Sequence, residues 1–181
     1  KSFFLKKKLF NKISTARSGN VIGGGDYSKD RLVPDIIRSF KHKKPLLIRN
    51  PSHIRPWQHV IEPTFGYLLL AQKQYLGIKQ FSNIAWNFGP DSINFLRVND
   101  LVKLFSNIIG KKMIIRIKKS KYLETKILKL DNKKSKKNLN WKPKWNVKTA
   151  LKKTIELENL KNSNKNIKNV CEKQIYSYLL R

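Results

Sequence analysis

Four arginines lie in loop-like surroundings where their side chains could bind phosphate groups. Arg17, Arg31, Arg49 and Arg55 each stand near glycine, proline or tryptophan, whereas lysine supplies most of the other cations. A planar guanidinium donates two parallel hydrogen bonds to phosphate oxygens, which an ammonium group does not do. These residues indicate either a phosphate or diphosphate site or, equally well, ion pairs with the few carboxylates nearby.

Three consecutive glycines, Gly23, Gly24 and Gly25, could also contact phosphate through their backbone amides. Glycine at these positions indicates unusual backbone dihedrals or a close approach to another group. The run matches neither a Walker A loop, which needs Gly-Lys-Ser/Thr before a helix, nor the G-x-G-x-x-G of a dinucleotide site. By itself it is more typical of a plain loop.

Histidine, cysteine and acidic residues give little support for a catalytic or metal site. His42, His53, His59 and the single Cys171 lack zinc-site spacing, and the sequence contains no G-x-S-x-G segment. We expect His59 to be a buried, hydrogen-bonded residue and Glu62 to be a charge at a helix start. Three aspartates suit turn or capping roles better than a calcium loop: Asp26, Asp30 and Asp35. We therefore assign no metal, whereas composition alone leaves a Ser/His/Asp triad open.

The elements that must position these residues follow from hydrophobic periodicity. Four segments have helical spacing: 33–40, 64–76, 98–109 and 146–160. Four short segments favour extended structure: 45–50, 85–90, 113–117 and 127–131. Gly110 should end the third helix, with Asn99 or Asp100 as its cap. Three flanking segments are predicted as the end of a buried helix, a polar linker and a loosely attached helix: 3–13, 161–169 and 170–180.

The chain is strongly basic, with 40 Lys and Arg against 11 Asp and Glu, a formal net charge of +29 and a pI of about 10.4. One explanation is a patch that binds nucleic acid or another polyanion. The other is a compositional drift toward Lys, Asn and Ile at exposed positions. The charge is spread along the chain, and lysine predominates over arginine. This distribution favours drift.

Length and composition indicate one folded domain, because 181 residues with 40% apolar content can bury a core. The most apolar stretch, 61–72, is shorter than the roughly 20 residues of a membrane span. The start at Lys1 has no signal-peptide pattern, so we expect the chain to begin within a longer protein. A single cysteine fits a reducing compartment, and we expect a cytoplasmic location without a membrane partner.

Seven segments, in order, resemble the CDP-glucose 4,6-dehydratases of the extended short-chain dehydrogenase/reductase superfamily. The resemblance extends from about Ser2 to about Leu157, and the Gly-Gly-Gly-Asp and Arg-Pro-Trp-Gln-His blocks are its most specific parts. The segments are 15–26, 30–35, 48–51, 55–63, 85–91, 128–131 and 141–145. Two positions depart from the family pattern: Leu123-Glu124-Thr125 replaces His-Glu-Ala, and Leu139-Asn140-Trp141 replaces Leu-Gly-Trp.

The resemblance implies an α/β fold: the C-terminal part of an NAD-binding Rossmann-type protein with most of its smaller substrate-binding domain. Residues 1–160 would form this part, and 161–181 a linker and terminal helix. The family oxidises the glucose C4 hydroxyl with NAD, removes water across C5 and C6, and returns hydride to C6. Its cofactor loop, catalytic Ser/Thr and Tyr-x-x-x-Lys pair lie upstream of the matching region, so the resemblance assigns no catalytic residue here and the chain alone is expected to be inactive. NAD is the implied cofactor of the complete enzyme.

The same resemblance implies which residues bind CDP-glucose. Asn20 and Arg55 would contact the diphosphate, and Asn87 would orient ribose or phosphate. Four residues would line the nucleotide end: Arg31, Leu32, Ile48 and Arg49. The change at Leu123 puts one polar contact in doubt, whereas the change at Asn140 affects only a tight turn. The family further implies a homo-oligomer when complete and a role in deoxysugar biosynthesis for lipopolysaccharide O-antigen, with no nucleic-acid partner. A basic polyanion-binding module is the alternative.

Overall fold

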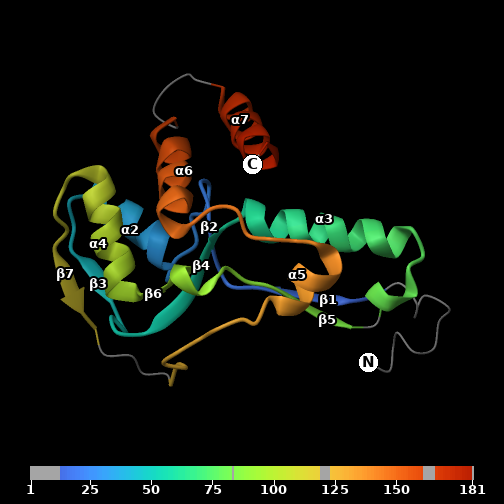
Figure 1. Ribbon diagram of the computed structural model, residues 1–181. Coiled ribbons are helices and arrows are strands. Elements are labelled where there is room, and N and C mark those ends of the chain that lie inside the picture. The colour runs from blue at the N-terminus through green and yellow to red at the C-terminus, as the bar shows by residue number, and fades with distance from the viewer. Residues whose placement is uncertain (1–12, 83, 119–122, 161–165, 181) are drawn as a thin grey trace.

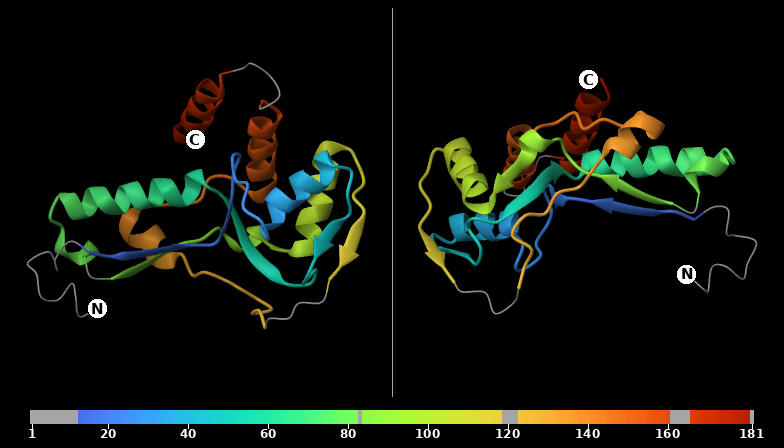
Figure 2. Two further views of the ribbon diagram at one scale, coloured as in Figure 1. Left: turned by 180° about the vertical axis from the view of Figure 1, so that it is seen from behind. Right: turned by 60° about the horizontal axis from the view of Figure 1, so that its bottom comes forward.

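The computed structural model describes residues 13–82, 84–118, 123–160 and 166–180. Strand β1 (Thr15–Ser18) pairs in parallel with β5 (Ala85–Phe88). Helix α3 (Ile61–Tyr75) runs alongside this pair, and α5 (Lys133–Leu139) packs on β5 (Figures 1 and 2). Parallel strands need crossover connections, commonly helical, and here α3 lies between β1 and β5 in the chain. This part of the molecule is therefore an α/β layer.

Five further strands form two small sheets at the other end of the molecule. Strand β4 (Ile54–His59) pairs in parallel with β2 (Asn20–Ile22) and antiparallel with β6 (Phe95–Arg97). Strand β3 (Leu46–Ile48) pairs in parallel with β7 (Ile115–Ile117). Because β1 and β2 are separated by Gly19 alone, one run of chain serves both parts of the molecule (Figure 1).

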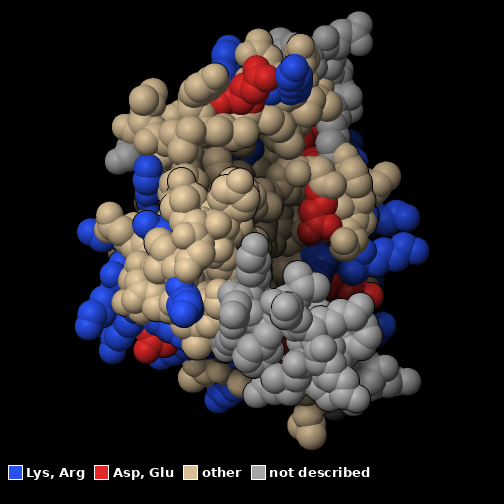
Figure 3. Space-filling model, turned by 90° about the vertical axis from the view of Figure 1, so that its right-hand side faces the viewer, with Lys and Arg blue, Asp and Glu red and all other residues tan. Residues whose placement is uncertain are grey.

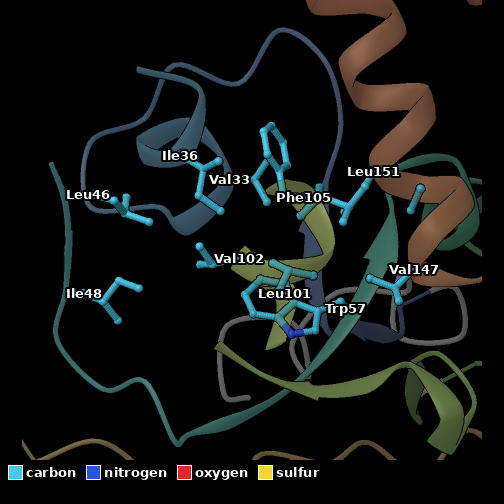
Figure 4. Close-up of a cluster of buried hydrophobic side chains, with 12 residues drawn as sticks. Val33, Ile36, Leu46, Ile48, Trp57, Leu101, Val102, Phe105, Val147 and Leu151 are labelled. Atoms are coloured by element: carbon cyan, nitrogen blue, oxygen red, sulfur yellow. The ribbon is translucent and has the colours of Figure 1, made fainter. Parts of the chain in front are cut away.

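The larger core lies between β3, β4 and three helices: α2 (Leu32–Lys41), α4 (Val98–Ile109) and α6 (Val147–Leu160). Leu46 and Ile48 point from β3 toward Ile36 and Val102 on the helices (Figure 4). Leu47, the residue between them in β3, is exposed, as the period of two requires. Alternation along a strand and helical spacing along α2 and α4 thus bury one common apolar face.

A second core lies beneath α3 and joins Trp86 and Phe88 of β5 to Trp141. Phe81 in the short helix η2 (Lys79–Phe81) stacks on Trp86, with ring centroids 5.5 Å apart. Gly66 lets α3 approach this core, because a Cβ there would lie 2.2 Å from Cδ1 of Phe88. Close packing of α3 on β5 therefore requires glycine at this position.

The four helical segments and three of the four extended segments are confirmed. The strand predicted over 127–131 is wrong, because only Ile127 pairs there, in an isolated bridge with Ile54.

Two helix ends also differ. Helix α4 ends at Gly110, which has φ +73°, but its N-cap is Arg97. Asn99 and Asp100 are wrong as caps, because both lie inside the first turn. The polar linker predicted over 161–169 is interrupted at Ile167, where α7 (Ile167–Leu179) begins.

One helix was not expected, and one expectation lies outside the described residues. Helix α5 was missed because its Lys- and Asn-rich sequence buries only Ser135 and Leu139. The helix predicted over 3–13 falls on residues that the structure does not describe, apart from Ile13. Among the described helices, none has the length and apolar character needed to cross a membrane.

Candidate nucleotide-sugar groove

Six of the seven residues expected to bind a nucleotide sugar line one groove of about 680 Å³. The groove lies where β2, β3 and β4 meet the start of α2. The six residues are Asn20, Arg31, Leu32, Ile48, Arg49 and Arg55. They come from four elements or their ends, and the fold brings them together although 35 positions separate Asn20 from Arg55.

The local structure explains why these side chains reach the groove. Asn20 opens β2 and Arg55 lies in β4, while Arg49 directly follows the last residue of β3. Arg31 is the N-cap of α2, with an extended backbone (φ −107°, ψ 129°), and its carbonyl accepts from the amide of Asp35 at 2.9 Å. The strand ends and the helix start therefore present polar groups to the same space.

Arg55 is the most constrained of these arginines, with its side chain 12% exposed. Its Nη1 donates to the carbonyl oxygens of Thr125 at 2.8 Å and Ile54 at 3.0 Å. Its Nη2 donates to Oε2 of Glu124 at 3.1 Å and contacts Nδ1 of His53 at 3.2 Å. Arg55 thus fastens the 124–126 segment beside β4, where Ile127 forms a bridge with Ile54.

The other groove arginines also face carboxylates. Arg49 Nη1 lies 3.8 Å from Oδ1 of Asp30, and Arg38 forms an ion pair with Asp35. Arg38 donates at 2.9 Å to the carbonyl oxygens of Tyr27 and Ser28 as well. The ion pairs that the sequence left open are therefore present for Arg49 and Arg55, and because both residues also line the groove, the phosphate site remains a prediction.

Asp26 stabilises the loop between β2 and α2. Burial raises the pKa of Asp26, but hydrogen bonds from Ser28 and the positive charges of Arg31 and Arg38 outweigh it and leave the pKa below its usual range. The backbone amide of Ser28 donates to Oδ1 of Asp26 at 2.9 Å, which is an Asx-type turn. The turn role expected for Asp26 is thus present, and among the described residues no cluster of His, Cys, Asp and Glu could hold a metal.

Two polar residues singled out from the sequence lie away from the groove. Asn87 is in β5, where its Nδ2 donates to the carbonyl oxygen of Asp131 at 3.2 Å and its buried Oδ1 has no hydrogen-bond partner in the structure. Arg17 is exposed in β1 and is in register with Asn87. The proposed contact of Asn87 with ribose or phosphate is not tested by this arrangement and remains a prediction.

The glycine run packs against α6. A Cβ on Gly24 would lie 2.3 Å from Cδ2 of Leu157, and the Gly25 amide, at φ +87°, donates to Oε1 of Glu158 at 3.0 Å. Bound NAD would need free backbone amides for its diphosphate. The glycine run itself therefore does not fit the diphosphate of a dinucleotide, because the Gly25 amide is engaged by Glu158 and Gly24 is packed on Leu157.

His59 and Glu62 lie together under α7, outside the groove. Burial, and secondarily the positive charge of Lys153, lowers the pKa of His59 to about 4. Burial raises the pKa of Glu62, although donated hydrogen bonds oppose this shift. Glu62 accepts from the hydroxyl of Tyr178 at 2.7 Å and from the amide of Trp145 at 2.6 Å. Both residues are satisfied parts of the core, as expected for His59, whereas Glu62 does more than charge a helix start.

Several polar groove residues were not assigned to a site from the sequence, and Arg38, His53 and Glu124 are among them. Arg38 was detectable in principle, since it follows Asp35 by three residues on a helix and such pairs face each other. Glu124 and His53 gave no local signal. Their place in the groove depends on the pairing of the 124–128 segment with β4, to which Ile54 and Leu128 contribute backbone hydrogen bonds.

Comparison with known proteins places this geometry in a known fold. The chain has a TM-score of 0.67 and 25% identity to UDP-glucose 4-epimerase of Thermotoga maritima in complex with UDP-glucose, over 79% of this chain and 44% of that one. It has a TM-score of 0.70 and 18% identity to dTDP-glucose 4,6-dehydratase of Bacillus anthracis in complex with NAD, over 87% and 47%. No family model matches the sequence.

The structure is therefore part of the fold of the extended short-chain dehydrogenase/reductases, the class of nucleotide-sugar epimerases and dehydratases. Within this class, the chain is 40% identical to CDP-glucose 4,6-dehydratase of Salmonella typhimurium over 145 residues. This finding confirms the resemblance found in the sequence. The match covers 80% of this chain and 40% of the relative, so the chain spans less than half the length of the proteins it resembles.

Proposed function

We propose that this chain is the nucleotide-sugar-binding part of a CDP-glucose 4,6-dehydratase, which forms CDP-4-dehydro-6-deoxyglucose in deoxysugar and O-antigen biosynthesis. One observation carries the proposal: six residues expected from the resemblance line a single groove with paired arginines. The complete enzyme would use NAD, reside in the cytoplasm and form a homo-oligomer. The identity to the Salmonella relative supports CDP-glucose as the substrate.

The groove supplies the chemistry that a nucleoside diphosphate needs. Arginines offer planar donors to the phosphate oxygens, and apolar Leu32 and Ile48 offer surface for the nucleoside. Arg49 is the most informative residue to change, because its side chain is 39% exposed and its one ion pair, with Asp30, is 3.8 Å long. Its loss should therefore affect binding more than folding.

We expect Arg49→Ala to weaken the binding of CDP by about tenfold, as for loss of one charged hydrogen bond. Isothermal titration calorimetry on the 181-residue chain measures this change. Arg116→Ala is the matched control, because Arg116 is exposed in β7 and does not line the groove. Equal loss of affinity in both variants, or none in Arg49→Ala, would contradict the proposal.

We further propose that this chain alone does not convert CDP-glucose, because it matches only 40% of the relative's length and its glycine run is engaged within the chain. Incubation with CDP-glucose and NAD should leave the substrate unchanged, as followed by chromatography of the nucleotide sugars. Formation of the 4-dehydro-6-deoxy product by the purified chain would overturn this part of the proposal. Binding of CDP in the same preparation shows that the protein is folded.

A polyanion-binding role is the second candidate, and its support is the net charge of +29. On the face shown in Figure 3, Lys and Arg lie mainly toward the two sides, and Asp and Glu also occur on it. This face therefore carries no continuous basic stripe among its described residues. We rank polyanion binding below nucleotide-sugar binding because the similarity to the Salmonella relative supports the latter.

A further inference from the structure

Resting on the proposed function, we propose that Glu124 is a specificity-determining residue of the groove. Its carboxylate holds Arg55 within the groove, so that an anion can bind this arginine only by displacing the carboxylate. A ligand that also contacts other parts of the groove can offset the free energy of breaking the Arg55–Glu124 ion pair, whereas a simple phosphate cannot.

The contacts of Arg55 carry the first step. Both of its terminal nitrogens have partners: Nη1 donates to backbone carbonyls, and Nη2 lies between Glu124 and His53. Among the described side chains that contact Arg55, Glu124 is thus the one with a negative charge.

The location of Glu124 carries the second step. It lines the same groove as Arg31, Arg49 and Arg55, and its side chain is 39% exposed. An incoming phosphate therefore meets a like charge beside the arginine that it would bind. Like charges placed against an unwanted ligand are a general source of specificity.

The distribution of acidic residues carries the third step. The chain has 11 acidic residues among 181, and four of them line this one groove: Asp26, Asp30, Asp35 and Glu124. A chain of net charge +29 attracts anions of every kind. Carboxylates beside the groove arginines reduce that general attraction within the groove. Glu124 has this effect at Arg55, whose side chain is less exposed than those of Arg38 and Arg49.

Glu124→Gln removes the charge and keeps a side chain of the same shape. We expect it to bind inorganic pyrophosphate about fivefold more tightly than the wild type does, since an exposed ion pair of this kind is worth up to about that factor. The affinity for cytidine, which has no phosphate, should not change. The preference for CDP over pyrophosphate should therefore fall. Calorimetry with these three probes measures all three effects.

Arg55 supplies the test of the coupling, because the gain should vanish in Arg55→Gln and in the charge-preserving Arg55→Lys, which lacks the planar fork. Glu172→Gln is the matched control: Glu172 lies on α7, 3.8 Å from Lys168, and its loss changes net charge equally. Thermal unfolding checks that each variant is folded.

An unchanged or lower affinity for pyrophosphate in Glu124→Gln would overturn the proposal, as would a gain that persists in both Arg55 variants or appears in Glu172→Gln. If the wild type binds neither CDP nor pyrophosphate, the proposal still requires that Glu124→Gln binds pyrophosphate. A Glu124→Gln variant that does not bind pyrophosphate would then overturn the proposal. A wild type that binds CDP no better than pyrophosphate contradicts the proposed function instead, so the two failures are distinguishable.

Discussion

At the scale of single residues, charge in this chain is organised by pairing. Arg38, Arg49 and Arg55 each have a carboxylate within 4 Å, although lysine and arginine outnumber acidic residues by 40 to 11. All three line the groove, so an arginine there has to be considered together with its carboxylate.

His59 gives a pH-dependent prediction at this scale. Its folded pKa of about 4 is below the ordinary histidine value of 6.5, so between these values the unfolded chain binds more protons than the folded one. The stability that it contributes is present above about pH 6.5 and is lost as pH falls toward 4. We expect a loss of up to about 3 kcal/mol over this window.

The prediction is tested with His59→Gln and urea unfolding at several pH values from 7 to 4. The stability of the wild type relative to the variant should fall with pH by that amount. The raised pKa of Glu62 acts in the opposite direction, with stability lost as pH rises, but it is present in both proteins and cancels in the difference. A difference that does not change with pH would show that burial of His59 does not perturb its titration.

At the scale of elements, α7 is held by polar contacts rather than attached loosely. The Tyr178 side chain, 1% exposed, reaches Glu62 at the start of α3, and Gln174 donates to the carbonyl oxygen of Lys153 in α6 at 3.1 Å. The rings of Trp145 and Tyr178 meet edge to face, with centroids 5.4 Å apart. Helix α7 therefore connects α3 and α6, which belong to the two cores.

We expect Tyr178→Phe to destabilise the protein by about 1–3 kcal/mol, because it leaves one oxygen of a fully buried carboxylate without its donor. Tyr176→Phe is the control, since Tyr176 lies on the same helix and is 64% exposed. Urea unfolding gives the free energies, and hydrogen exchange should show faster exchange over α7 in Tyr178→Phe alone. Equal stability of the two variants would show that docking of α7 through Tyr178 does not contribute to the cooperative stability of the protein.

Local pattern predicted the elements better than it predicted their partners. Helix α4 was found from its apolar spacing and from Gly110, both of which lie within the segment itself. The docking of α7 could not be found in this way, because Tyr178 and Glu62 are 116 positions apart. The groove could not be found from local spacing either, because its arginines come from separate elements. Only the family resemblance predicted that they belong to one site.

At the scale of the whole molecule, the β1 and β5 pair has the character of part of a larger sheet. Parallel strands are normally covered on both faces, but Thr15, Ala16 and Arg17 of β1 are all exposed. The chain also matches solved structures over only 44–48% of their length. An exposed strand edge of this kind promotes association with other strands.

The net charge gives the last prediction, which concerns the molecule rather than its groove. We expect duplex DNA to bind weakly at low ionic strength, and the logarithm of its affinity to fall linearly with log salt, in proportion to the phosphates neutralised. CDP affinity should fall less, because a diphosphate in the groove meets few cations at short range and the Debye length is already about 8 Å at physiological salt. Fluorescence anisotropy with labelled DNA and calorimetry with CDP, both between about 0.05 and 0.3 M salt, measure the two slopes.

The Arg49→Ala variant should weaken CDP binding and leave the salt dependence of DNA binding unchanged, since one exposed cation among 40 contributes little to a diffuse charge. Tight DNA binding that persists at the upper salt concentration would instead make the charge functional, and would place polyanion binding ahead of the nucleotide sugar.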